Sequence, residues 1–250
     1  MFLLVAPGQI LNMDFILGPP ALSTPFTFSI PTHNRLGNET KRVGVYSSGE
    51  LGATALLCLI ISELITTNRL DTISVVAFTV LKRDGSKHYS TRIINKISEH
   101  FNVPIINVDN IENNEPAFFY NRIGKVSFQK VYDDYSHDTD IYQGNNRMAP
   151  DDIRPFTQSL NLFHHDEQVL WKSPFLDLHK PQILDVYYKL GCEDIIPWTH
   201  SCTVMAQGKC DNCYSCKERE WAFSALEKEY INTIPLGISD IISDGTWKYS

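Results

Sequence analysis

The chain has 250 residues, of which 43% are hydrophobic and 20% are charged, and its formal net charge is −7. This composition is that of an ordinary globular protein with enough residues for a full core, and it lacks the basic excess of proteins that grip a phosphate backbone. The apolar run that starts at Met1 meets Pro7, so it is too short for a signal-peptide core or a membrane span. We therefore expect a soluble, cytoplasmic protein with neither a membrane nor a nucleic acid as partner.

The first 41 residues read as an N-terminal extension in which short apolar runs alternate with prolines, among them Pro19, Pro20 and Pro25. Proline fixes φ and removes a backbone donor, so this pattern favours extended structure and turns over helix. We expect a hairpin between residues 15–18 and 26–28. The sequence does not indicate what the extension does.

From residue 42 strands alternate with helices, and we assign residues 42–195 to one α/β domain. Short runs at 43–46, 73–78 and 104–108 predict strands. The apolar segment after the first run predicts a helix to about residue 67, and apolar residues at helical spacing predict a second helix over 89–101. This rhythm is typical of a doubly wound parallel sheet with right-handed crossovers, in which the ligand lies beyond the carboxyl ends of the strands.

The C-terminal part is expected to hold two more helices. Residues 180–190 form an amphipathic pattern that Gly191 ends as a C-cap, and the last helix is predicted over 214–230. We assign residues 196–235 to a metal-binding region with this last helix, and residues 236–250 to an irregular tail.

Four of the six cysteines lie close together near the end of the chain, as Cys202, Cys210, Cys213 and Cys216. Two overlapping C-x2-C pairs can aim their sulfurs at one ion only if the backbone turns tightly, and Gly208, Asp211 and Asn212 tolerate such turns. A closed set of four thiolates suits a structural zinc ion, so we predict a zinc-binding knuckle here. An iron–sulfur cluster is the main rival, because C-x2-C-x2-C also occurs in cluster-binding proteins, and four free buried cysteines are the remaining alternative.

The polar turn after the first predicted strand is the second candidate site. A serine- and glycine-rich turn that opens a helix offers unpaired backbone N–H groups and a positive helix dipole to a phosphate. The chain contains no Walker loop, so the signal rests on this turn alone. The residues concerned are Ser48, Gly49, Glu50, Leu51, Gly52, Ala53 and Thr54.

Together the two signals resemble the 7-cyano-7-deazaguanine synthase family of PP-loop ATP pyrophosphatases, whose loop reads S-G-G-x-D-S-T. Residues 48–54 align with that loop without a gap, and residues 85–88 look like the family's G-Q-[RK]-H, which adds His88 as a residue near ATP. The G-x-N and P-D-C-R-P-E-F segments have counterparts at 144–146 and 150–156, and the family's order continues through Lys180 to the cysteines. The resemblance covers roughly residues 42–225 and implies a PP-loop fold, of the adenine nucleotide alpha-hydrolase-like type.

The resemblance also implies a reaction. Family members adenylate the carboxylate of 7-carboxy-7-deazaguanine with ATP and Mg²⁺, and ammonia then displaces the adenylate. In this chain the turn would hold the ATP phosphates, while Asn146, Asp151 and Arg154 would shape the purine pocket. The partners would then be ATP and a deazapurine carboxylate, and a homodimer is compatible with these expectations.

The turn departs from the family at three positions, so activity stays open. Gly52 replaces the aspartate expected to help hold the metal, and Glu50 and Ala53 replace a glycine and a serine. An amine other than ammonia could be the acceptor. The chain could instead be an inactive PP-loop homologue that serves as a binding or structural protein, and restoring Gly52→Asp together with Glu50→Gly is expected to raise ATP affinity if only the loop has decayed. A tRNA-modifying PP-loop enzyme is disfavoured by the net charge of −7.

Overall fold

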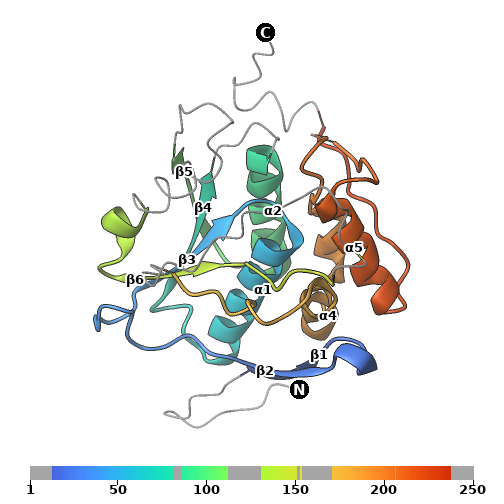
Figure 1. Cartoon of the computed structure of the whole chain (residues 1–250). Helices are drawn as coiled ribbons and strands as arrows, with labels where there is room; N and C mark the ends of the chain where they lie inside the picture. Colours follow the sequence, from blue (N-terminus) through green and yellow to red (C-terminus); the bar gives the residue numbers. More distant parts are fainter. Residues whose placement is uncertain are drawn as a thin grey trace.

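A computed structural model describes residues 13–80, 86–111, 131–150, 153, 171–205 and 207–237 (Figure 1). The predicted substrate residues Asp151 and Arg154 lie outside the described residues. Among the described helices, none combines the length and apolar character that a bilayer crossing requires.

The central sheet is parallel, and its strands are β3 (Arg42–Ser47), β4 (Ser74–Val80), β5 (Ile105–Ile111) and β6 (Thr139–Gln143). Their order across the sheet is β5-β4-β3-β6, with parallel pairing throughout. The chain steps outward from β3 to β5 and then returns to the other side of β3. The order therefore reverses between β3 and β6, which makes their carboxyl ends the switch point where such sheets bind ligands.

Helices cover both faces of the sheet, as predicted for a doubly wound fold. The helices α1 (Leu51–Thr66), α2 (Ser86–Phe101) and α4 (Lys180–Leu190) lie on one side in Figure 1. On that side Val75 and Ala77 of β4 join the main core, whereas Val76 and Phe78 face a second cluster with Val131, from helical residues 131–135. This alternation along β4 is the period of two that a strand imposes.

The N-terminal segment packs into the main core. The predicted hairpin is present as β1 (Met13–Leu17) and β2 (Thr24–Phe28), joined through the short helix η1 (Pro20–Leu22). Its apolar side chains share a core with α1 and α4. Gln182 Nε2 of α4 donates to the Leu22 carbonyl at 2.8 Å, which fixes the hairpin to the domain.

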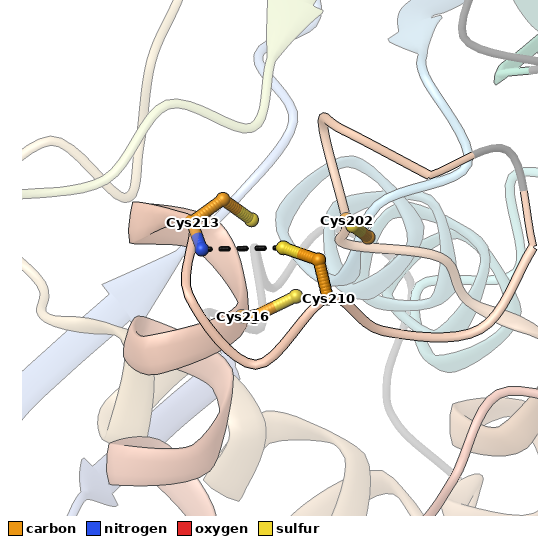
Figure 2. Close-up of side chains that lie close together, drawn as sticks. All are labelled: Cys202, Cys210, Cys213 and Cys216. Carbon is orange, nitrogen blue, oxygen red and sulfur yellow. Dashed lines mark hydrogen bonds between the residues drawn. The ribbon is translucent and has the colours of Figure 1, made fainter.

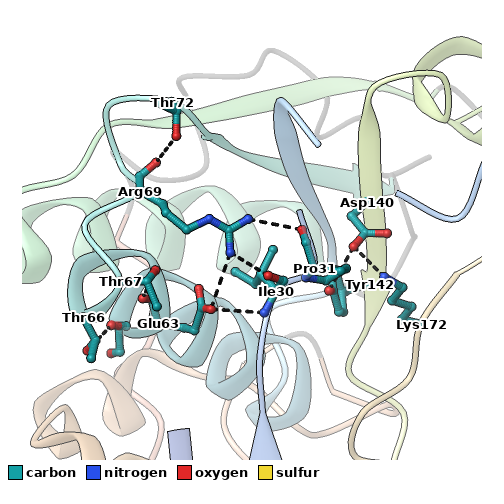
Figure 3. Close-up of polar contacts among 11 residues, drawn as sticks. Ile30, Pro31, Glu63, Thr66, Thr67, Arg69, Thr72, Asp140, Tyr142 and Lys172 are labelled. Atoms are coloured by element: carbon teal, nitrogen blue, oxygen red, sulfur yellow. Dashed lines mark hydrogen bonds and ion pairs between the residues drawn. The ribbon is translucent and has the colours of Figure 1, made fainter. Parts of the chain in front are cut away.

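A buried ion pair holds the chain that follows the hairpin. The Ile30 N–H donates to Oε1 of Glu63 at 3.1 Å, and the Arg69 guanidinium donates to the carbonyls of Ile30 and Pro31 (Figure 3). Glu63 and Arg69 lie 3.7 Å apart near the end of α1. The end of α1 is thereby bonded to the segment that leads into β3.

The C-terminal part contains η3 (Glu193–Trp198) and α5 (Tyr214–Ala225). The predicted C-cap is correct, since Gly191 ends α4 with a φ of 68°. The predicted helix over 214–230 is too long at its end: Glu227 adopts a φ of 55°, and the Lys228 N–H bonds back to the Phe223 carbonyl at 3.0 Å. This turn folds Tyr230 back against the Phe223 ring, so the helix cannot continue.

Candidate functional site

The turn between β3 and α1 lies at the switch point of the sheet, where the sequence placed it. Gly49 adopts a φ of 76°, and a Cβ there would lie 2.8 Å from the Cβ of Tyr89 and 3.1 Å from the Ser90 nitrogen. Glycine is therefore required both by the left-handed backbone and by the close approach of α2. The backbone conformation and this close contact explain why Gly49 matches the first glycine of the loop motif that the sequence resembles.

The turn is also fixed to the segment that carries the first cysteine of the cluster. The His200 N–H donates to the Gly49 carbonyl at 2.8 Å. The His200 ring stacks on Tyr89 with centroids 4.2 Å apart and an interplanar angle of 6°. The turn, α2 and the chain leading to Cys202 thus form one interlocked unit.

A chain of hydrogen-bonded polar side chains joins α2 to the carboxyl ends of β3 and β4 and to Asn107 of β5. Ser90 Oγ lies 2.6 Å from Ser47 Oγ of β3 and 3.0 Å from Thr79 Oγ1 of β4, and Thr79 Oγ1 donates to Asn107 Oδ1 of β5 at 3.1 Å. None of these four residues was among the predicted ligand-binding residues. The signal available was a polar side chain at or near the end of each predicted strand.

The side chains of the first turn of α1 do not face a phosphate site. Leu51 and Thr54 are each 1% exposed, and Tyr187 Oη donates to the Leu51 carbonyl at 2.7 Å. Ala53 is buried as well, whereas Ser48 and Glu50 are half-buried. What this turn can offer an anion is therefore mainly backbone N–H, because the first N–H groups of a helix have no intrahelical partner.

Gly52, which stands where the family has its aspartate, lies directly against the loop after β6. A Cβ on Gly52 would sit 2.4 Å from the Gly144 carbonyl oxygen, and a Cβ on Gly144 would sit 2.5 Å from the Ala53 nitrogen. Backbone atoms of Gly144 therefore occupy the space that an aspartate side chain would need. The expectation that Gly52→Asp restores ATP affinity conflicts with this packing.

The other predicted ligand residues lie in different surroundings. His88 is buried in α2, at 8% exposure. Asn146 lies in the loop after β6, where its Oδ1 accepts from Lys180 Nζ at 2.9 Å and its Nδ2 donates to Glu218 Oε1 at 3.1 Å. Lys180 and Glu218 form an ion pair at 3.2 Å with side chains 9% and 6% exposed. The loop after β6 is thus tied to α4 and α5.

The four predicted cysteines come together in space (Figure 2). Their sulfur atoms all lie within 4.8 Å of one another. Cys202 follows η3, Cys213 is the N-cap of α5, and Cys216 lies in its first turn. Gly208 and Asp211 adopt the left-handed conformation, at φ values of 72° and 57°, which confirms the tight turns expected between the ligands.

Burial, backbone hydrogen bonds and neighbouring thiols shift the pKa values of Cys213 and Cys216 in opposite directions. Burial works against the Cys213 thiolate, but hydrogen bonds from the backbone of Thr203 and Cys216 and from neighbouring thiols outweigh it and lower the pKa of Cys213 to about 6. Burial and the neighbouring cysteines raise the pKa of Cys216. The Met205 and Cys213 N–H groups also donate to the sulfurs of Cys202 and Cys210, both at 3.2 Å. Such bonds stabilise thiolates, which are the metal-binding form.

The spacing of the sulfurs fits a single tetrahedral ion. Zinc–sulfur bonds of about 2.3 Å place the four sulfurs of a tetrahedron about 3.8 Å apart. In this structure the four sulfurs all lie within 4.8 Å of one another, which exceeds that edge by about 1 Å at most. A four-iron cubane would attach each thiolate to a different iron at a different corner, and would hold the sulfurs farther apart. The residues present therefore fit a mononuclear metal site.

Comparison with known families gives a match over part of the chain. Residues 126–227 match the family model described as "Queuosine biosynthesis protein QueC". This segment starts after β5 and includes all four cysteines, and the turn between β3 and α1 lies outside it. No protein in the curated set matches.

Among solved structures, the chain is similar to the U34-tRNA thiolase NcsA from Methanococcus maripaludis, solved with its [4Fe-4S] cluster. The identity is 14% and the TM-score is 0.39, with 65% of this chain and 61% of that chain covered. The chain thus spans less than two thirds of that protein's length.

Proposed function

We propose that this chain is an ATP-dependent enzyme of the 7-cyano-7-deazaguanine synthase type, within the PP-loop ATP pyrophosphatases. It would adenylate a 7-deazapurine carboxylate for attack by ammonia or another amine. The observation that carries this proposal is the match of residues 126–227 to the QueC family model. The parallel sheet, with a glycine-containing turn at its switch point, supports the same class.

The roles of the residues follow from what they can offer. Backbone N–H groups of the turn, with Ser48 and Gly49, would bind phosphate oxygens, and Asn146 would contact the purine from the loop after β6. Magnesium supplies charge neutralisation for a pyrophosphate leaving group. With glycine at position 52, Glu50 is the acidic side chain that remains in this turn.

We propose zinc as the ion held by Cys202, Cys210, Cys213 and Cys216. Four protein ligands leave no open position, which is typical of a structural rather than a catalytic site. Bound there, the ion would join the segment after η3 to the start of α5. Its effect would be on folding, not on the reacting atoms.

A second function is favoured by the contact between Gly52 and Gly144. Because Gly144 fills the place of the family's metal-binding aspartate, the fold and the metal site could persist in a protein that no longer turns over ATP. Such a protein would serve as a binding or structural partner.

Release of pyrophosphate by the full chain distinguishes the two functions. The assay contains ATP, Mg²⁺, 7-carboxy-7-deazaguanine and ammonium, and the enzyme proposal predicts release that depends on the carboxylate. Gly49→Ala should abolish it, because the added Cβ meets α2 at 2.8 Å. Gly37→Ala is the matched control, since Gly37 has a φ of 80° but nothing within 4 Å of its Cβ position.

No pyrophosphate release by wild-type protein, with no magnesium-dependent ATP binding by calorimetry, would favour the non-enzymatic function. Equal loss of release in the Gly37 and Gly49 variants would remove the turn from the proposal, because both changes strain a left-handed glycine and only one lies at the turn.

A further inference from the structure

Arg219 is a buried cation on α5, the helix that also contains Cys216. It is 2% exposed. Its guanidinium donates to Thr199 Oγ1 at 2.7 Å, to Ser201 Oγ at 3.3 Å and to the Ile231 carbonyl at 3.2 Å. It also donates to the carbonyls of Ile196 and Thr199, at 3.3 and 3.4 Å.

These contacts connect the two separate parts of the cysteine cluster. Cys216 precedes Arg219 by three residues on the same helix, so both lie on one face of α5. Thr199 and Ser201 come just before Cys202 in the chain. The hydrogen bonds of Arg219 therefore fix the position of Cys202 relative to Cys213 and Cys216.

The hydrogen bonds of Arg219 with the described residues include no carboxylate. Within the part of the chain that the structure describes, no ion pair involves this residue, and its hydrogen-bond partners are carbonyls and hydroxyls. Burial lowers its pKa, yet an arginine stays protonated in proteins. A buried charge is costly unless an opposite charge lies near.

Four thiolates around a divalent ion would provide that opposite charge. Such a site carries a net charge of about −2, from four thiolates and one divalent cation. Cys216 lies three residues before Arg219 on α5, so one of these thiolates would lie on the same helix face as the guanidinium. Four neutral thiols would leave the guanidinium without a compensating charge.

We infer that Arg219 is the positioning residue and the counter-charge of the four-cysteine metal centre, holding Cys202 in place as its fourth ligand. The inference rests on the metal site proposed above and is independent of the proposed ATP chemistry. Residues that orient metal ligands typically change affinity 10–100-fold when they are replaced. Lysine keeps the charge but cannot reach the same set of acceptors with one planar fork.

Cobalt binding by the full chain tests this role. Cobalt(II) in a tetrahedral thiolate site has a charge-transfer absorption that grows with the number of bound sulfurs. Wild-type protein should show the spectrum of four thiolates, and Cys202→Ser that of three. We expect Arg219→Lys to bind Co²⁺ about tenfold or more weakly and to shift toward the three-thiolate spectrum.

Arg69→Lys is the matched control. Arg69 also donates to two backbone carbonyls, those of Ile30 and Pro31, but these lie in the segment that leads into β3 and not in the segment that carries Cys202. Its variant should keep the four-thiolate spectrum. A purely structural arginine would lower thermal stability without changing the cobalt spectrum of the folded protein.

Wild-type affinity and spectrum in Arg219→Lys would overturn the inference, whatever its melting temperature. If that variant does not fold, the double variant Thr199→Ala with Ser201→Ala removes the two hydroxyl acceptors of Arg219 instead, and an unchanged spectrum there would overturn the inference equally. A wild-type protein without a four-thiolate spectrum would refute the metal centre and this inference together. A lack of pyrophosphate release would refute only the proposed enzyme activity.

Discussion

At Gly52, the substitution that would restore the family's loop motif conflicts with the packing of the backbone. The alignment alone suggests that an aspartate would rebuild the family's loop. The structure shows that position 52 is glycine because the Gly144 backbone lies against it, and that Gly144 is glycine for the reciprocal reason. The pair was not predictable from sequence, since 91 residues of chain separate the two glycines and the intervening crossover decides where Gly144 lies.

We therefore expect Gly52→Asp to destabilise the protein by about 1–3 kcal/mol and not to raise ATP affinity, because backbone must move to admit the side chain. Thermal unfolding and calorimetry with ATP measure the two effects. Glu50→Gln, which adds no volume in the same turn, should stay close to wild type. Tighter ATP binding by Gly52→Asp would show that the loop after β6 yields readily.

Glu63 predicts a pH dependence of stability. Burial raises its pKa above the ordinary 4.5, although the Ile30 N–H, Arg69 and Thr67 act in the opposite direction. With a raised pKa in the folded state, the unfolded chain loses this proton first as pH rises. Glu63 therefore costs stability progressively from about its ordinary pKa up to its folded pKa.

Glu63→Gln keeps an acceptor for the Ile30 N–H and cannot ionise, so we expect wild type to lose stability relative to this variant as pH rises above 4.5. Chemical denaturation of both proteins across that range measures the difference. A difference that does not change with pH would mean that Glu63 ionises as readily in the fold as in the unfolded chain.

At the scale of elements, α4 and α5 are joined by a buried ion pair. Lys180 and Glu218 lie 3.2 Å apart with little exposure, and Tyr214 Oη donates to Glu218 Oε1 at 2.8 Å. The sequence predicted α4 and its glycine cap from local signals. It did not predict this pair, because helical periodicity fixes which face is apolar but not which buried charges meet.

Lys180→Met should destabilise the protein by about 3–5 kcal/mol, because it leaves the Glu218 carboxylate buried and unpaired. The double variant Lys180→Met with Glu218→Leu should recover most of that loss, since both charges are then gone. A double-mutant cycle from denaturant titrations measures the coupling. Additive effects of the two changes would mean that the pair contributes nothing as a pair.

At the scale of the whole molecule, the class of fold was predicted correctly from the sequence, but one strand of the sheet was not predicted. The three strands with apolar runs were recognised, whereas β6 was missed because it is short and begins with Thr139 and Asp140. The buried Asp140 carboxylate pairs with Lys172, 32 residues later in the chain, at 2.6 Å and accepts from the Tyr142 hydroxyl at 3.2 Å. The cysteine cluster was predictable because all of its ligands lie within one short stretch of sequence.

Removal of the metal should loosen one part of the molecule and not the rest. The cysteine cluster forms its own small group, separate from the main core between the sheet and α1. Treatment with a strong chelator should therefore increase hydrogen exchange in residues 199–225 while β3 and β4 stay protected. Uniform loss of protection over the whole chain would show that the ion supports global folding instead.

The hydrogen bond from His200 to the Gly49 carbonyl has a practical consequence. This backbone hydrogen bond joins the turn proposed to bind a nucleotide to the segment that carries a proposed metal ligand. His200, its donor, precedes Cys202 by two residues. We therefore expect a ligand that moves the Gly49 peptide to move His200 as well. With Co²⁺ bound by the cysteines, the absorption spectrum would then report nucleotide binding at the β3–α1 turn.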